Sequence, residues 1–151
     1  MLTKKIPGLI KPSGIKVLKD GSARGFLFGG NLTTLVHTIG TPYEIPWNDT
    51  ILFIEDIGES PYRLDRLLTH LDKSGRLRKI SGLILGSFAD NDRKESAVLH
   101  KTVQERITEL LQDRDIPVWT HFPTGHCRRN LTLPVGIEVT MNSIAGELLF
   151  G

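Results

Sequence analysis

The sequence Ile51-Leu52-Phe53-Ile54 is followed directly by the acidic pair Glu55-Asp56. Four consecutive apolar residues without polar alternation are typical of a strand that is covered on both faces, as in a parallel sheet. Shortly afterwards, Ser60-Pro61 combines a hydroxyl cap with a proline that suits the first turn of a helix. This order of strand and helix is the first half of a βαβ unit.

The residues that follow continue the alternation of strand and helix. One apolar face at helical spacing is formed by Leu64, Leu67, Leu68 and Leu71, before Gly75. A second such face is formed by Leu99, Val103, Ile107, Leu110 and Leu111. Because apolar runs at residues 82–86 and 116–119 flank this second face, residues 51–119 predict two right-handed βαβ units around a parallel sheet.

Shorter strands are expected on both sides of this centre. Residues 15–18 and 24–28 predict two strands that Asp20-Gly21 joins as a hairpin, and a helix follows over residues 32–39. Towards the carboxyl terminus, strands are expected at residues 131–133, 137–141 and 147–150. The whole pattern predicts an α/β domain with a parallel βαβ centre and antiparallel strands at both ends.

Composition excludes several classes of protein. The chain has 151 residues, of which 39% are hydrophobic and 24% charged, and its formal net charge of +2 is too balanced to indicate nucleic-acid binding. No apolar run is long enough to span a bilayer, and the amino terminus does not resemble a signal peptide. The single cysteine, Cys127, excludes an intramolecular disulfide and a multi-cysteine zinc site. We therefore expect a cytoplasmic protein that binds no membrane, metal or cofactor.

Polar residues follow two of the predicted parallel strands. Glu55 and Asp56 follow the first, whereas His121 and then Gly125-His126 follow the third. Carboxyl ends of parallel strands share one edge of a sheet, where ligands bind. A carboxylate that accepts a hydrogen bond from one imidazole nitrogen leaves the other nitrogen as a general base. The alternative is that these carboxylates are solvated loop charges or favour a helix start.

Nothing in the sequence supplies a nucleophile to accompany this base. There is no Gly-x-Ser-x-Gly elbow, no phosphate-binding glycine loop and no His-Glu-x-x-His motif. Cys127 adjoins His126, but neighbouring residues on a loop rarely point at one another well enough to activate a thiol. The candidate residues therefore make up half of an active site.

Several blocks together resemble the carboxyl-terminal half of the LD-carboxypeptidases, also called muramoyltetrapeptide carboxypeptidases. In chain order they are residues 29–32, 40–43, 51–66, 82–88, 116–118, 125–126 and 132–136. Members of this family are two-domain serine peptidases whose amino-terminal domain carries the nucleophile. Their carboxyl-terminal domain has a swivelling β/β/α fold and supplies a glutamate and a histidine. The resemblance implies that these residues are Glu55 and His126, as parts of a Ser-His-Glu triad.

The resemblance also implies a substrate. It points to a full-length enzyme that releases terminal D-alanine from murein tetrapeptide during cell-wall recycling. A sister branch of the family cleaves the peptidyl nucleotide microcin C, and half of such an immunity peptidase is an alternative. Asp56 and Glu59 are further candidates, for substrate binding.

The amino-terminal nucleophile domain of the family has no counterpart in this sequence. We expect residues 1–12 to be the remnant of an interdomain linker and residues 13–151 to form the carboxyl-terminal domain, so that Met1 is not the natural start. The isolated chain is then expected to be inactive and, with its domain interface uncovered, to form a homodimer. The alternative is a stand-alone binding or regulatory domain without catalysis.

Overall fold

The computed structural model describes residues 8–90 and 92–151, which form one eight-stranded sheet and three helices. The order of the strands across the sheet is β1-β8-β7-β3-β4-β5-β6-β2. The strands are β1 (Leu9–Ile10), β2 (Lys16–Lys19), β3 (Ser22–Asn31), β4 (Thr50–Ile57), β5 (Ile80–Ala89), β6 (Val118–Thr120), β7 (Glu138–Asn142) and β8 (Glu147–Phe150). The helices are α1 (Leu32–Thr38), α2 (Pro61–Lys73) and α3 (Arg93–Leu110).

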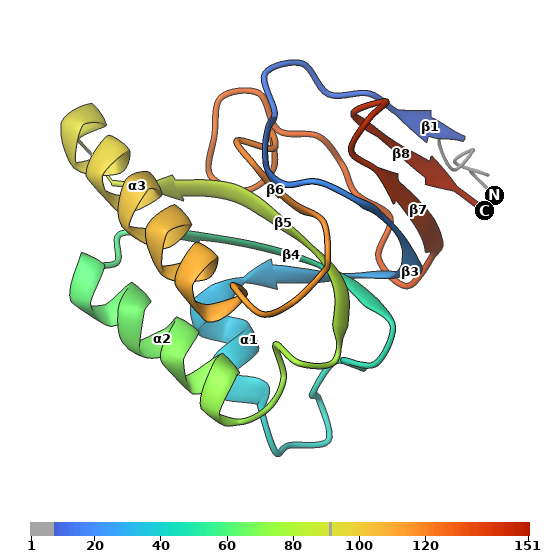
Figure 1. The fold of residues 1–151 in the computed structure, drawn as a ribbon. Helices are drawn as coiled ribbons and strands as arrows, with labels where there is room; N and C mark the ends of the chain where they lie inside the picture. Colours follow the sequence, from blue (N-terminus) through green and yellow to red (C-terminus); the bar gives the residue numbers. More distant parts are fainter. Residues whose placement is uncertain (1–7, 91) are drawn as a thin grey trace, which may run out of the picture.

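The centre of the sheet is parallel, as predicted. Strands β3, β4, β5 and β6 run in one direction and are connected by α1, α2 and α3 in turn (Figure 1). β7, β8, β1 and β2 are antiparallel and lie at the two ends of the sheet. The predicted α/β fold is therefore confirmed, with one βαβ unit more than predicted because β3 is parallel to β4.

The helices begin where their capping residues predict. The side chain of Asn31 accepts a hydrogen bond from the Thr34 backbone N–H at 3.0 Å, and that of Ser60 accepts one from the Arg63 N–H at 3.4 Å. Pro61 lies in the first turn of α2. The starts of α1 and α2 therefore depend on residues within four positions of each other, which is why local sequence predicts them.

The predicted hairpin of residues 15–28 is wrong. β2 pairs with β6 at one edge of the sheet, whereas β3 lies between β4 and β7. β3 is ten residues long and contains Leu27, which is fully buried, so that it gains more from a central position than from a two-stranded ribbon. The Gly21 carbonyl instead accepts a hydrogen bond from the Ser143 N–H at 3.0 Å.

The strand predicted at residues 131–133 is also absent from the described chain. The Leu131 N–H donates to the Pro123 carbonyl at 2.7 Å, so this segment is bonded to a loop and not to a strand. Leu131 and Leu133 nevertheless pack against buried residues of the sheet. Their apolar character reflects this packing, which alternation alone cannot distinguish from a strand.

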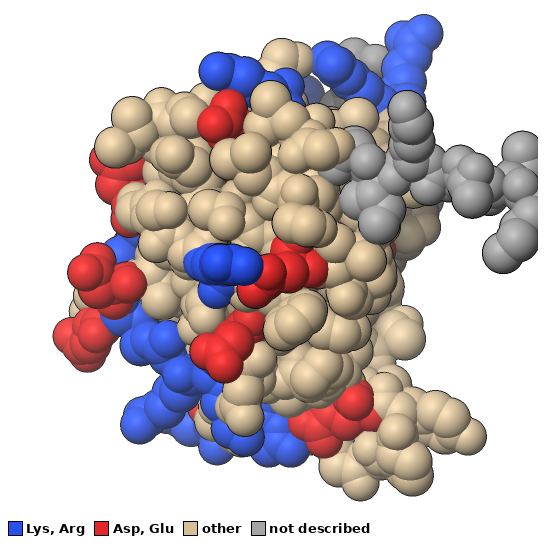
Figure 2. All heavy atoms as spheres, turned by 90° about the vertical axis from the view of Figure 1, so that its right-hand side faces the viewer, with Lys and Arg blue, Asp and Glu red and all other residues tan. Residues whose placement is uncertain are grey.

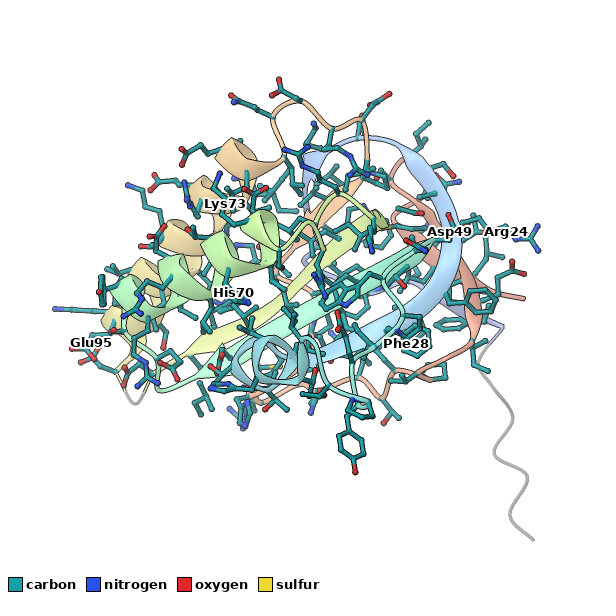
Figure 3. All side chains as sticks on the ribbon, turned by 90° about the horizontal axis from the view of Figure 1, so that it is seen from below. Arg24, Phe28, Asp49, His70, Lys73 and Glu95 are labelled. Carbon is teal, nitrogen blue, oxygen red and sulfur yellow. The ribbon has the colours of Figure 1, made fainter. Side chains whose placement is uncertain are left out.

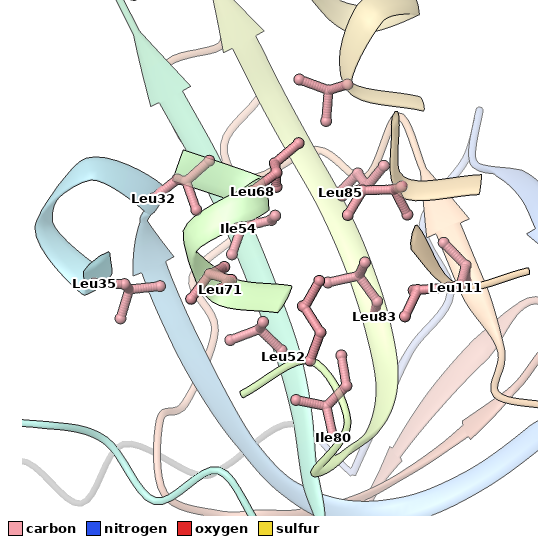
Figure 4. Packing of buried hydrophobic residues seen from close by; sticks show 14 of the residues in the cluster. Leu32, Leu35, Leu52, Ile54, Leu68, Leu71, Ile80, Leu83, Leu85 and Leu111 are labelled. Carbon is pink, nitrogen blue, oxygen red and sulfur yellow. The ribbon is translucent and has the colours of Figure 1, made fainter. Parts of the chain in front are cut away.

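Successive residues of β4 pack into two different cores. Leu52 and Ile54 face α1, α2 and α3, together with Leu83 and Leu85 of β5 (Figure 4). The intervening Ile51 and Phe53 belong to the core on the opposite face. This alternation is the normal two-residue period of a strand, and it assigns Glu55 and Asp56 to opposite faces of the sheet.

The core on the face without helices is closed by the sheet itself. Buried residues from β7 and β8 pack against β3, β4 and β5, and partly buried residues of β1 and β2 join them from the two edges. Figure 1 shows the corresponding curvature of the sheet. Both tryptophans are buried, and the Trp119 indole N–H donates to Ser143 Oγ at 2.9 Å.

Most charged side chains lie on the outside of this arrangement, whereas Glu55 and Asp56 are buried. Figure 3 shows Glu95 of α3 and Arg24 of β3 at opposite ends of the molecule, each directed away from the sheet. None of the helices in the described part of the chain has the length and apolar character that crossing a bilayer requires.

Candidate active site

Glu55 and His126 meet at the carboxyl end of β4. Glu55 Oε2 lies 2.7 Å from His126 Nδ1, although 71 residues separate the two positions in the sequence. The Glu55 side chain is 8% exposed and the His126 side chain 49% exposed. The carboxylate is therefore held inside the protein, while the imidazole reaches solvent.

The loop that carries His126 is hydrogen-bonded along the end of β5. The Phe122 N–H donates to the Leu85 carbonyl at 3.1 Å, and the Ser87 N–H donates to the Thr124 carbonyl at 2.9 Å. Ser87 Oγ also donates to the His126 carbonyl at 3.1 Å. These bonds extend the ladder of β5 past the end of β6 and place the loop beside Glu55.

Two glycines make room for the Glu55 side chain. Gly125 has a φ of +94°, and a Cβ there would lie 2.6 Å from Glu55 Oε2. A Cβ on Gly86 would lie 2.7 Å from the Thr124 carbonyl oxygen and 3.3 Å from Glu55 Cβ. The positive φ of Gly125 allows the turn that precedes His126. The sequence reasoning assigned no role to Gly86, and a glycine near the end of a buried strand was its only signal.

The geometry of the pair sets the chemistry of His126. A buried carboxylate beside Nδ1 favours the tautomer in which Nδ1 carries the proton and donates it to Glu55. The other ring nitrogen, Nε2, then has a free lone pair. The arrangement can therefore accept a proton from a hydroxyl group and return it to a leaving group.

Asp56 lies on the opposite face of β4 from this pair. Its carboxylate accepts hydrogen bonds from Asn31 Nδ2 at 2.7 Å, from the Thr33 N–H at 3.0 Å and from Thr33 Oγ1 at 2.8 Å. The side chain is buried and its oxygens are used by residues at the start of α1. The structure therefore separates Asp56 from Glu55 and His126.

Glu59 contacts neighbouring residues of the same region. Its carboxylate accepts a hydrogen bond from Thr33 Oγ1 at 3.3 Å and lies 2.9 Å from Arg63 Nε. It also lines a cavity of about 430 Å³ between the first turns of α2 and α3. Neither of these polar contacts is with Glu55 or His126.

The remaining candidates do not join the pair. His121 stacks on His100, with ring centroids 5.1 Å apart. Burial, and next the negative charge of Glu55, raises the pKa of the Cys127 thiol. A thiol with a raised pKa is a poor nucleophile at neutral pH. Within the described residues no group of three or more His, Cys, Asp or Glu side chains could hold a metal ion.

The pattern described as LD-carboxypeptidase C-terminal domain matches residues 24–141, which include both Glu55 and His126. This chain belongs to the LD-carboxypeptidase family. The family resemblance stated from the sequence is thus confirmed.

Named relatives of the LD-carboxypeptidase domain agree with this assignment. A murein tetrapeptide carboxypeptidase of Pseudomonas aeruginosa is 38% identical over 114 residues, which cover 74% of this chain and 36% of the relative. The microcin C7 self-immunity protein of Escherichia coli is 34% identical over 125 residues, covering 82% and 35%. The crystal structure of a muramoyltetrapeptide carboxypeptidase from Oxalobacter formigenes superposes with a TM-score of 0.73 and 38% identity, covering 91% and 48%. The chain thus spans less than half the length of each of these proteins.

Proposed function

We propose that this LD-carboxypeptidase domain supplies the glutamate and histidine of a Ser-His-Glu triad that releases terminal D-alanine from murein tetrapeptide. The observation that carries the proposal is the 2.7 Å contact between the buried Glu55 carboxylate and His126 Nδ1. Membership of the family supports the reaction class, and the names of two relatives support a murein peptide as the substrate.

In this mechanism His126 Nε2 takes the proton of a serine hydroxyl as that oxygen attacks the carbonyl carbon of the scissile bond. The same nitrogen later returns the proton to the amine of the departing D-alanine. Glu55 stays ionised, orients the ring through Nδ1–H and stabilises the imidazolium that forms in between. The half-exposed ring of His126 leaves Nε2 accessible to groups outside this domain.

The serine nucleophile is proposed to come from an amino-terminal domain. Within the described residues no serine hydroxyl is bonded to the His126 ring, and Ser87 Oγ donates to the His126 backbone carbonyl instead. Without a nucleophile no acyl-enzyme can form. The 151-residue chain by itself is therefore expected to hydrolyse no peptide.

Complementation tests this proposal. The chain is mixed with a separately expressed amino-terminal half of the Pseudomonas aeruginosa relative, and release of D-alanine from murein tetrapeptide is measured. We expect activity only from the mixture, and its loss with Glu55→Gln or His126→Ala. Glu105→Gln, which changes an exposed carboxylate of α3, is a matched control that should keep the activity.

Two outcomes would contradict the proposal. Activity that survives His126→Ala would show that the imidazole is not the base. If circular dichroism shows both halves to be folded and no D-alanine is released by their mixture, a stand-alone binding domain becomes the better interpretation.

A further inference from the structure

A second cavity lies at the carboxyl end of the parallel strands. It has a volume of about 250 Å³ and lies between α3 and the loop that follows β6. The residues that line it are Gly86, Ser87, His100, His121, Phe122, Pro123, Cys127 and Arg129. They bring two imidazoles, a guanidinium, a hydroxyl and a thiol, but no carboxylate, so the lining offers hydrogen-bond donors without a negative charge.

The contact of His100 with the Phe88 backbone fixes the tautomer of its neutral ring. The Phe88 N–H donates to His100 Nε2 at 3.2 Å, so a neutral His100 ring carries its proton on Nδ1. Burial, and next the proximity of His121, lowers the pKa of His100. At neutral pH the ring is therefore an uncharged donor through Nδ1–H.

His121 stacks on His100 and has an unusual backbone conformation. The two rings stack at 5.1 Å with an interplanar angle of 25°. His121 has a φ of +58°, a left-handed conformation that is uncommon for residues other than glycine. Its Nε2 lies 3.4 Å from Gln104 Nε2, an amide donor, which favours a proton on Nδ1 in this ring too.

Arg129 contributes the formal positive charge at the rim. Its Nη1 donates to Ser13 Oγ at 2.8 Å, which uses one of the five N–H groups of the guanidinium. Among the residues that the structure describes, no carboxylate forms an ion pair with Arg129. The rest of the guanidinium is therefore available to an acceptor from outside the chain.

We propose that this cavity binds a small oxyanion, a carboxylate or a phosphate group, close to the Glu55–His126 pair. An oxyanion would accept hydrogen bonds from the guanidinium and the imidazoles, which the protein leaves without a negative partner. The cavity adjoins the pair, because it is lined by Gly86, where a Cβ would lie 3.3 Å from Glu55 Cβ, and by Cys127, which follows His126 directly. The identity of the oxyanion rests on the proposed function: it is a carboxylate of the peptide substrate.

Binding can be measured on the chain itself by NMR of labelled imidazoles and backbone amides. The probes are N-acetyl-D-alanine, its uncharged amide and inorganic phosphate. We expect saturable shifts at His100, His121 and Arg129 with at least one of the two anions, and none with the amide. Response to phosphate alone would support the oxyanion site but assign it to a phosphate group.

Variants locate the binding site. Arg129→Gln should weaken anion binding at least about tenfold, as expected for loss of a charge-assisted hydrogen bond. Arg128→Gln is the matched control, because Arg128 is an exposed neighbour that does not line the cavity. His121→Asn should also weaken binding, and asparagine tolerates the left-handed backbone of this position.

The proposal is overturned if no anion produces saturable shifts, or if Arg128→Gln and Arg129→Gln weaken binding equally. Equal weakening would mean that the anions respond to the general charge of this loop. The readout requires no release of D-alanine, so failure of the oxyanion site and failure of the proposed reaction are distinguishable.

Discussion

Gly125 determines how closely the loop of His126 approaches Glu55. Substitution by alanine adds a Cβ 2.6 Å from the Glu55 carboxylate at a φ of +94°. We expect Gly125→Ala to cost about 1–3 kcal/mol of unfolding free energy and to displace His126 from Glu55. Chemical denaturation measures the first effect and the imidazole NMR signals the second.

Gly40 is the matched control for this substitution. It has a φ of +79°, but a Cβ there would meet no atom within 4 Å. Gly40→Ala should therefore show only the cost of the backbone conformation and leave the His126 signals unchanged. Unchanged His126 signals in Gly125→Ala would contradict the role assigned to this glycine.

The Glu55 carboxylate is expected to fix the tautomer of His126. In Glu55→Ala the Nδ1–H loses its acceptor, so the ring should exchange between its two neutral tautomers. Nitrogen-15 shifts of the imidazole distinguish one tautomer from a mixture. Glu59→Ala should leave these shifts unaltered, and a single Nδ1–H tautomer that persists in Glu55→Ala would refute the prediction.

At the scale of elements, Asp56 connects the end of β4 to the start of α1. Asp56→Ala removes the acceptor of three hydrogen bonds from Asn31 and Thr33. Because these donors lie in a partly buried region, we expect a loss of about 3 kcal/mol in unfolding free energy. Urea unfolding measures the loss, and the His126 NMR signals should remain unchanged.

The same variant separates this structural role from substrate binding. If Asp56→Ala kept its stability within about 0.5 kcal/mol of the parent and instead impaired peptide hydrolysis in the complemented mixture, substrate binding would be the better interpretation. The side of β4 on which Asp56 lies makes the structural role the expected result.

At the scale of the whole molecule, the Glu44 carboxylate connects the loop between α1 and β4 with the loop between α2 and β5. It lies 2.8 Å from Arg76 Nε and accepts hydrogen bonds from the Gly40 N–H and the Trp47 indole N–H. These contacts, with Arg76 the largest contributor, lower the pKa of Glu44 from its ordinary 4.5 to about 2. A lowered pKa means that ionised Glu44 stabilises the fold above pH 4.5, and that this contribution is lost as the pH falls towards 2.

Acid unfolding of the whole molecule should therefore depend on Glu44. Glu44→Gln is expected to be less stable than the parent near pH 7, and the difference should shrink towards pH 2. Urea unfolding at a series of pH values measures it. A difference that stays constant from neutral to acidic pH would contradict the prediction.

Self-association of the chain is expected from its exposed apolar residues. Leu9 of β1 pairs with Leu149 of β8, and both side chains are more than 40% exposed. Uncharged residues cover most of the face that contains β1, β7 and β8 (Figure 2). We predict a homodimer by light scattering that Leu149→Lys weakens, and a monomeric mass at high concentration would count against it.

Structure was predicted correctly where the interacting residues are close in the sequence, and incorrectly where they are far apart in it. Caps such as Asn31 and Ser60 bond to backbone three positions away, so residue type was sufficient to predict where helices begin. The partners of β2 and β3 lie more than twenty residues away along the chain, and there the prediction of a hairpin was wrong.

The sequence by itself determined the alternation of strands and helices in the parallel centre, the family and the two residues proposed for catalysis. Only the tertiary structure decided that Glu55 and His126 approach to 2.7 Å, that Asp56 turns to the other face, and that two imidazoles and a guanidinium line one cavity. The physical reason is that period and capping are local properties of the chain. Distances between side chains depend on strand pairing and on glycines, such as Gly86 and Gly125, that allow two backbones to approach.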